Sequence, residues 1–199
     1  MRTNQLTISQ KLLSLSLIMI VFLISSCNGE GTSENAKQEE QVKEVEIKAP
    51  KMDIHAATFM GDIKALEQHI KAGTDLNSKD AYGSTPLNIA ATFGKTDVAL
   101  LLIKGGASLS ATNIDGSTPL HTAAFFCRTE IVEALLAKGA DKQLKNQYGS
   151  TPLETVSAPF EQVKPIYLQL AKDLGPLGLR LDLERMEITR PQIVQLLDK

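Results

Sequence analysis

The chain has no tryptophan, only two cysteines and only three histidines among its 199 residues. No carboxylate or second histidine shares a helical face with His55 or His121 at the spacing of metal ligands, so we expect no metal site. A Ser-His-Asp set, a glycine-rich phosphate loop and a paired-carboxylate site are also missing from any plausible context. We therefore expect no catalysis, no cofactor and no small-molecule substrate.

Clusters of basic residues are missing as well. The chain has 21 Lys and Arg against 23 Asp and Glu, which gives a formal net charge of −2. Because no basic patch and no stripe of basic and aromatic residues occurs, nucleic acid is not an expected partner. This acidity also gives the protein no attraction to anionic lipid.

The N-terminal segment carries no acidic residue before Glu30 and contains one apolar run. Arg2 and Lys11 precede that run, which extends over residues 12–24. The run is shorter than the ~20 residues that a membrane-spanning helix needs. A basic start, a short apolar run and small residues after it are typical of a secretory signal peptide. We predict that residues 1–26 are such a signal.

The motif Ile24-Ser25-Ser26-Cys27 directly after the apolar run resembles the lipobox of bacterial lipoproteins. The resemblance implies cleavage before Cys27 and acylation of its thiol. Since two or more acyl chains anchor a protein stably, we expect the mature protein to be attached to a membrane of the bacterial cell envelope, facing the periplasm or the exterior. The alternative is an uncleaved anchor in which Cys27 occurs by chance.

Residues 27–50 follow as a polar segment of mixed charge with few apolar side chains. Such a composition buries too little apolar surface to offset the entropy lost on ordering. We predict a flexible tether between the lipid and a folded domain at residues 51–199.

From Lys51 onward one pattern recurs every 33 residues: Ser-Thr-Pro-Leu stands at residues 84–87, 117–120 and 150–153. A threonine hydroxyl can accept from the free N–H groups of a helix start, and proline suits the first helical position. Glycines at positions 73, 106 and 139 recur with the same period, and glycine is common just after the C-terminus of a helix. The pattern predicts a repeated unit of two helices.

The 33-residue period and the segment Thr118-Pro119-Leu120-His121-Thr122-Ala123-Ala124 resemble the ankyrin-repeat family. The resemblance implies an all-α repeat solenoid, in which helix-turn-helix units stack and β-hairpin fingers join them. We expect repeats at about residues 51–83, 84–116 and 117–149, and a modified repeat at 150–174 whose first helix ends near Ser157. Residues 175–199 would then be a C-terminal cap, with Thr189 and Gln192 at capping-box spacing.

Proteins of this family bind other proteins through the fingers and the exposed end of the first helix of each repeat. We therefore expect another protein as the partner and a monomeric chain. The expected contact residues are Phe59, Met60, Thr92, Phe93, Phe125 and Phe126 at the helix ends, and Ala81, Tyr82, Ile114, Asp115, Gln147 and Tyr148 at the fingers. Aromatic anchors among polar residues are typical of interface hot spots. Phe93 and Phe126 have an alternative role as core residues between repeats.

Two interpretations of the function remain open. One is a general protein-interaction module, and the other is a dedicated regulator, inhibitor or stabilising partner of one exported enzyme.

Cys127 occupies the position of Gly61 and Gly94, where the chain turns with positive φ, and is either a tolerated thiol or a redox site. His121 should bond to Thr118, whereas His55 has no threonine at that offset.

Overall fold

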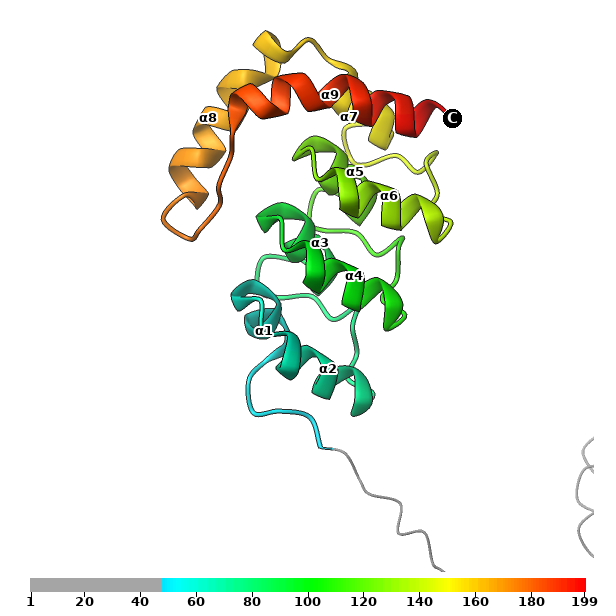
Figure 1. Ribbon diagram of the computed structural model, residues 1–199, viewed down its shortest axis with the longest axis vertical. Coiled ribbons are helices and arrows are strands. Elements are labelled where there is room, and N and C mark those ends of the chain that lie inside the picture. The colour runs from blue at the N-terminus through cyan, green and yellow to red at the C-terminus, as the bar shows by residue number, and fades with distance from the viewer. Residues whose placement is uncertain (1–47) are drawn as a thin grey trace, which may run out of the picture. The chain divides into compact units, whose positions relative to one another are not determined.

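The structure, a computed structural model, describes residues 48–199; the predictions for the signal peptide, for Cys27 and for most of the tether lie outside these residues. The described part contains helices and turns (Figure 1). The helices are α1 (Ile54–Met60), α2 (Ile63–Lys71), α3 (Pro86–Phe93), α4 (Thr96–Lys104), α5 (Pro119–Phe125), α6 (Thr129–Ala137), α7 (Pro152–Ser157), α8 (Phe160–Leu174) and α9 (Leu183–Asp198). No β-strand occurs between residues 48 and 199, so the fingers are turns and the expected β-hairpins are not confirmed.

The helices pair within each repeat and stack between repeats. In the first three repeats α1 packs on α2, α3 on α4, and α5 on α6. The first helices of successive repeats form one layer, and α2, α4 and α6 form a second layer beside it (Figure 1). This arrangement is the helical stack that the 33-residue period predicted.

Each first helix begins at a side-chain cap. The hydroxyl of Thr85, Thr118 or Thr151 accepts from a backbone N–H of the first turn, and a proline follows at once. In the first repeat Asp53 takes this place, and its carboxylate accepts from the N–H groups of His55 and Ala56. These caps satisfy N–H groups that the helix itself leaves free.

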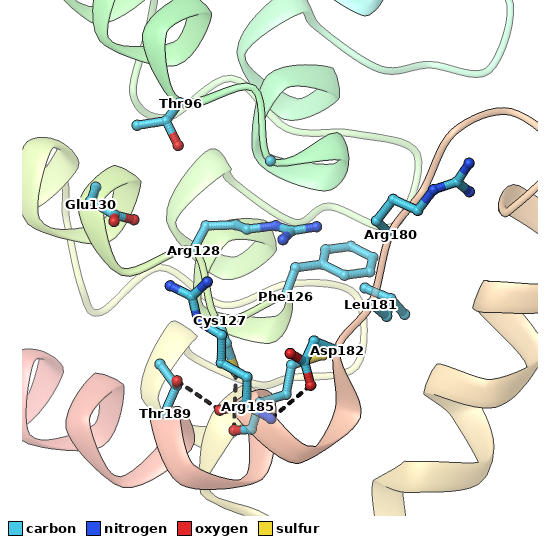
Figure 2. A pocket seen from close by; sticks show the side chains of 12 residues that line it. Thr96, Phe126, Cys127, Arg128, Glu130, Arg180, Leu181, Asp182, Arg185 and Thr189 are labelled. Carbon is cyan, nitrogen blue, oxygen red and sulfur yellow. Dashed lines mark hydrogen bonds between the residues drawn. The ribbon is translucent and has the colours of Figure 1, made fainter.

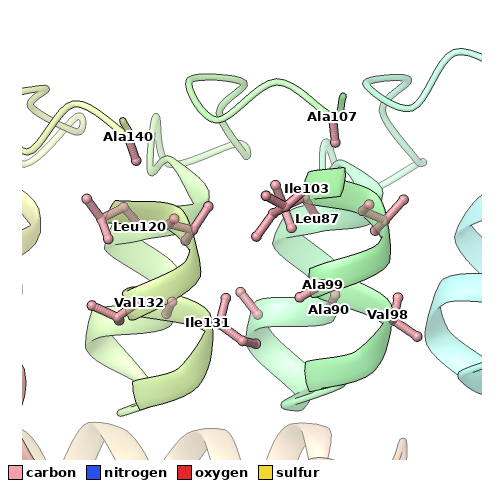
Figure 3. Close-up of a cluster of buried hydrophobic side chains, with 14 of the residues drawn as sticks. Leu87, Ala90, Val98, Ala99, Ile103, Ala107, Leu120, Ile131, Val132 and Ala140 are labelled. Carbon is pink, nitrogen blue, oxygen red and sulfur yellow. The ribbon is translucent and has the colours of Figure 1, made fainter. Parts of the chain in front are cut away.

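The core lies between the two layers and continues through all the repeats. Leu87 and Leu120, in equivalent positions of α3 and α5, are completely or almost completely buried, and small residues such as Ala90 and Ala99 let neighbouring helices approach closely (Figure 3). Burying one leucine side chain contributes roughly 1.5–3 kcal/mol. Because each repeat covers the apolar face of the next, a single repeat is not stable by itself.

The last repeat differs from the others. Helix α7 stops at Ser157, as expected before Pro159, and α8 ends at the segment 175–178. Helix α9 packs against both α7 and α6, so it occupies the position of the repeat's second helix. Helix α8 is therefore an insertion, and it projects from the stack beside the C-terminal end of α5 (Figure 1).

The expected capping box at Thr189 and Gln192 is wrong. Helix α9 begins two turns earlier, where the Asp182 carboxylate accepts from the Arg185 N–H at 3.0 Å. Thr189 lies inside the helix, and its hydroxyl donates to the Arg185 carbonyl at 2.7 Å. Aspartate is as good an N-cap residue as threonine, and Asp182 precedes Thr189 in the chain. None of the helices between residues 48 and 199 combines the length and apolar character that crossing a bilayer requires.

Candidate partner-binding surface

One side chain closes the tip of each finger. The Asp80 carboxylate accepts from the N–H groups of Tyr82 and Ser84 at 2.9 and 2.8 Å. Asn113 and Asn146 make the same pair of bonds in the next two fingers. Aspartate and asparagine favour such turns, and a glycine with positive φ follows in each finger. The tips are therefore held in one conformation before any partner binds.

Each finger carries one large apolar side chain that water reaches freely. Tyr82 is 80% exposed, Ile114 68% and Tyr148 74%. We call these three residues the finger surface. Ala81 and Gln147 beside them are also exposed, and Asp115 is half-buried. Exposed apolar side chains that recur in consecutive repeats suit a protein interface.

The second and third fingers are bonded to each other. The Gln147 N–H donates to the Asp115 carbonyl at 3.0 Å, and the Tyr148 hydroxyl donates to the Asp115 carboxylate at 3.2 Å. The charge of Asp115, together with this bond, raises the pKa of the Tyr148 hydroxyl above its ordinary value. The bond to Asp115 orients the Tyr148 ring on the finger surface.

The aromatic residues at the helix ends mostly pack on one another. The rings of Phe59 and Phe93 meet edge to face with their centroids 4.9 Å apart. Phe126 is only 7% exposed, and its ring meets Phe125 in the same way at 5.0 Å. Phe126 thus has the core role that the sequence left open. Among the six expected contact residues at the helix ends, only Met60 is exposed, and Thr92 is half-buried.

Phe125 lies beneath the inserted helix. Its ring centroid is 4.7 Å from that of Tyr167, and the Tyr167 hydroxyl donates to the Phe125 carbonyl at 2.7 Å. Tyr167 is completely buried. Helix α8 therefore partly covers the helix end of the third repeat, where Phe125 is half-buried. The signal for this was the apolar spacing of Phe160 and Tyr167, which needs a covering neighbour.

One position near each helix start ties a repeat to the following finger. His121 Nε2 donates to the Ser150 carbonyl at 2.9 Å, and its Nδ1 lies 2.8 Å from the Thr118 hydroxyl. This confirms the expected role of His121. The equivalent Asn88 uses its amide in the same way, donating to Thr85 and to the Ala111 carbonyl.

His55 has no threonine partner, as expected, and Asp53 takes the place of the threonine. His55 Nδ1 lies 3.0 Å from the Asp53 carboxylate, and Nε2 donates to the Ser78 carbonyl at 2.8 Å. His69 is buried, with Nε2 donating to the Met52 carbonyl at 2.9 Å. The three histidines therefore join segments of the chain.

His121 should make stability depend on pH. Burial lowers its pKa below the ordinary value of 6.5, against the opposing effect of the Ser150 and Leu144 carbonyls. The folded state therefore favours neutral His121, and its contribution is present above about pH 6.5 and is lost as pH falls through the lowered pKa. Urea unfolding of His121→Asn, which copies Asn88, should show a smaller loss of stability on acidification. An unchanged pH dependence would assign the effect to other groups.

Cys127 has the backbone conformation that its position predicted, with φ of 54°. Burial raises the pKa of its thiol to about 11. The sulfur lies 3.8 Å from the Met186 carbonyl, under the start of α9. Because the thiolate is the reactive form, these features favour a tolerated thiol over a redox site.

Comparisons with known proteins agree with this geometry. Residues 54–146 match the family model for ankyrin repeats in three copies. A 52-residue segment is 40% identical to the potassium channel SKOR of Arabidopsis thaliana, covering 26% of this chain and 6% of the channel. The crystal structure of the ankyrin repeat domain of Bcl-3, a member of the IkappaB protein family, matches with a TM-score of 0.50 and 29% identity over 51% of this chain and 45% of that one. The chain thus spans less than half the length of either protein. Residues 54–146 of this chain therefore have the helical fold of ankyrin repeats.

Proposed function

We propose that this protein is a protein-binding module that docks its partner on the finger surface and is held in the bacterial cell envelope by lipid on Cys27. The observation that carries the proposal is the exposure of Tyr82, Ile114 and Tyr148 on successive fingers. The anchoring part rests on the resemblance of residues 24–27 to a lipobox.

The finger surface has the physical properties of a binding site. Tyrosine offers a large contact area and loses little conformational entropy on binding, because it has only two side-chain torsions. The fixed tips lower the entropic cost further, since little backbone has to be ordered. The bond between Tyr148 and Asp115 orients one of the two rings in advance.

Photo-crosslinking tests the proposal in the membrane-anchored protein. A photoreactive phenylalanine analogue at position 82, 114 or 148 should give a crosslinked adduct with one discrete protein. The same analogue at Leu100 or Ile188, which are exposed on α4 and α9, should not. If only the control positions gave adducts, the partner would bind at a surface other than the fingers.

Alanine variants then measure how much each anchor contributes. With the crosslinked partner in hand, Tyr82→Ala should weaken binding about thirtyfold, because truncating a hot-spot residue costs ≥ 2 kcal/mol. The exposed ring supports little folding energy, so the melting temperature should stay unchanged. Leu100→Ala is the matched control. Full affinity in a variant with alanine at all three finger positions would refute the docking surface.

A further inference from the structure

A groove crosses the turns that join the two helices of the first three repeats. Its larger part is a pocket of about 460 Å³ between those turns and the start of α9 (Figure 2). A second pocket of about 410 Å³ extends from Met60 along the start of α4. Both are lined by Gly94 and Thr96, so the two pockets are neighbours, and we call them together the groove. This groove is separate from the finger surface.

Three arginines line the larger pocket without a carboxylate partner. No Asp or Glu among residues 48–199 lies within salt-bridge distance of Arg128, Arg180 or Arg185. The Arg128 guanidinium donates to the Thr92 carbonyl at 3.1 Å and lies against Gly94, where a Cβ would come within 2.8 Å of it. Burial lowers the pKa of Arg128, and the charge of Arg185 lowers it further. An anion beside these groups would relieve that repulsion.

The acidic residues of the groove already have other roles. The Asp182 carboxylate caps α9. Asp97 and Glu130 stand in the first turns of α4 and α6, where the helix dipole favours a negative charge. Arg128 donates to the Thr92 carbonyl and Arg180 to the Gly175 carbonyl at 3.1 Å, whereas the Arg185 guanidinium has no hydrogen-bond or salt-bridge partner among residues 48–199. The groove therefore has cationic groups to offer a ligand.

We propose that this groove binds an acidic segment of the partner protein, with its carboxylates on Arg180 and Arg185. The inference rests on the proposed function and specifies the partner's chemistry. Arg180 lies on the opposite side of the pocket from Arg185 (Figure 2). An extended segment can contact both arginines and reach the neighbouring pocket, where Met60 offers an exposed apolar side chain. Guanidinium groups bind carboxylates with two parallel bonds, which favours arginine here.

The test uses the whole mature chain and a fluorescent peptide of alternating glutamate and leucine. Fluorescence anisotropy at low salt should detect binding that weakens as salt is added. Arg180→Gln with Arg185→Gln should weaken binding about tenfold, since two charge-assisted pairs are lost. Both side chains are exposed, so folding should be unaffected. The matched control is Lys71→Gln with Lys138→Gln, which removes the same charge from exposed positions at the far ends of α2 and α6.

Each other outcome overturns the proposal. Equal affinity for a peptide with glutamine in place of glutamate would exclude carboxylate recognition. Equal weakening in the lysine control would show only a general charge effect. Arginine-dependent binding of inorganic phosphate or phosphatidylglycerol vesicles, without binding of the peptide, would assign the groove to those ligands. If the analogue at position 82 still crosslinks to the partner but the glutamate-leucine peptide does not bind, the proposed function stands. Only the proposal that the groove binds an acidic segment is then refuted.

Discussion

Replacing Ile193 with aspartate is expected to unfold the last repeat and to cause aggregation. Ile193 is completely buried in the core, on the helix that packs against α7 and α6. A carboxylate there loses its hydration and gains no partner, so the cost should exceed about 4 kcal/mol. Once α9 detaches, the apolar faces of α6 and α7 become exposed to solvent, and contiguous apolar surface promotes association.

The same helix supplies the control for this experiment. Ile188→Asp places the same charge on α9 at a side chain that is 66% exposed, and it should leave stability within about 0.5 kcal/mol. Urea unfolding followed by circular dichroism, with light scattering, compares the two variants. Cooperative unfolding of soluble Ile193→Asp at the unchanged midpoint would show that α9 does not hold the stack closed.

Replacing Cys27 with alanine is expected to remove the protein from the membrane completely. If Cys27 is diacylated, its loss removes ~0.8 kcal/mol for every buried CH₂ of the acyl chains. The variant should incorporate no alkyne-labelled fatty acid and should appear in the soluble fraction after cell breakage. The acidic chain offers no electrostatic attraction to anionic lipid in place of the acyl chains.

Cys127→Ala is the matched control, because it removes the other cysteine and should leave acyl labelling and fractionation unchanged. The Cys27 variant would contradict the lipobox interpretation if it were still cleaved after Ser26 and still sedimented with membranes.

The features that could be predicted from the sequence are those set by neighbouring residues. Thr85, Thr118 and Thr151 cap their helices with their own side chains, and the turn at Cys127 follows from its place in the repeat. The exposed fingertips were predictable for the same reason, since Tyr82 and Tyr148 occupy equivalent positions.

The features that escaped prediction depend on contacts between distant segments. Phe125 was expected at a contact surface, and the sequence did not indicate that Tyr167 partly covers it from an insertion 42 residues further along the chain. Helix α9 was expected as part of a C-terminal cap over the last apolar face, and its position as the second helix of the fourth repeat was not foreseen. Arg128 and Arg185 lie in different repeats and share no motif, so nothing in the local pattern indicated their shared pocket.

The inserted helix α8 also affects the order in which the chain folds. In the earlier repeats a tight turn joins the two helices, whereas α7 and α9 are joined through the whole of residues 158–182. Closing that longer connection costs more conformational entropy than closing a tight turn. Contacts distant in sequence form slowly, and a repeat array propagates from wherever it first nucleates. The stack should therefore nucleate among the middle repeats, with the fourth repeat the last to assemble and the first to open.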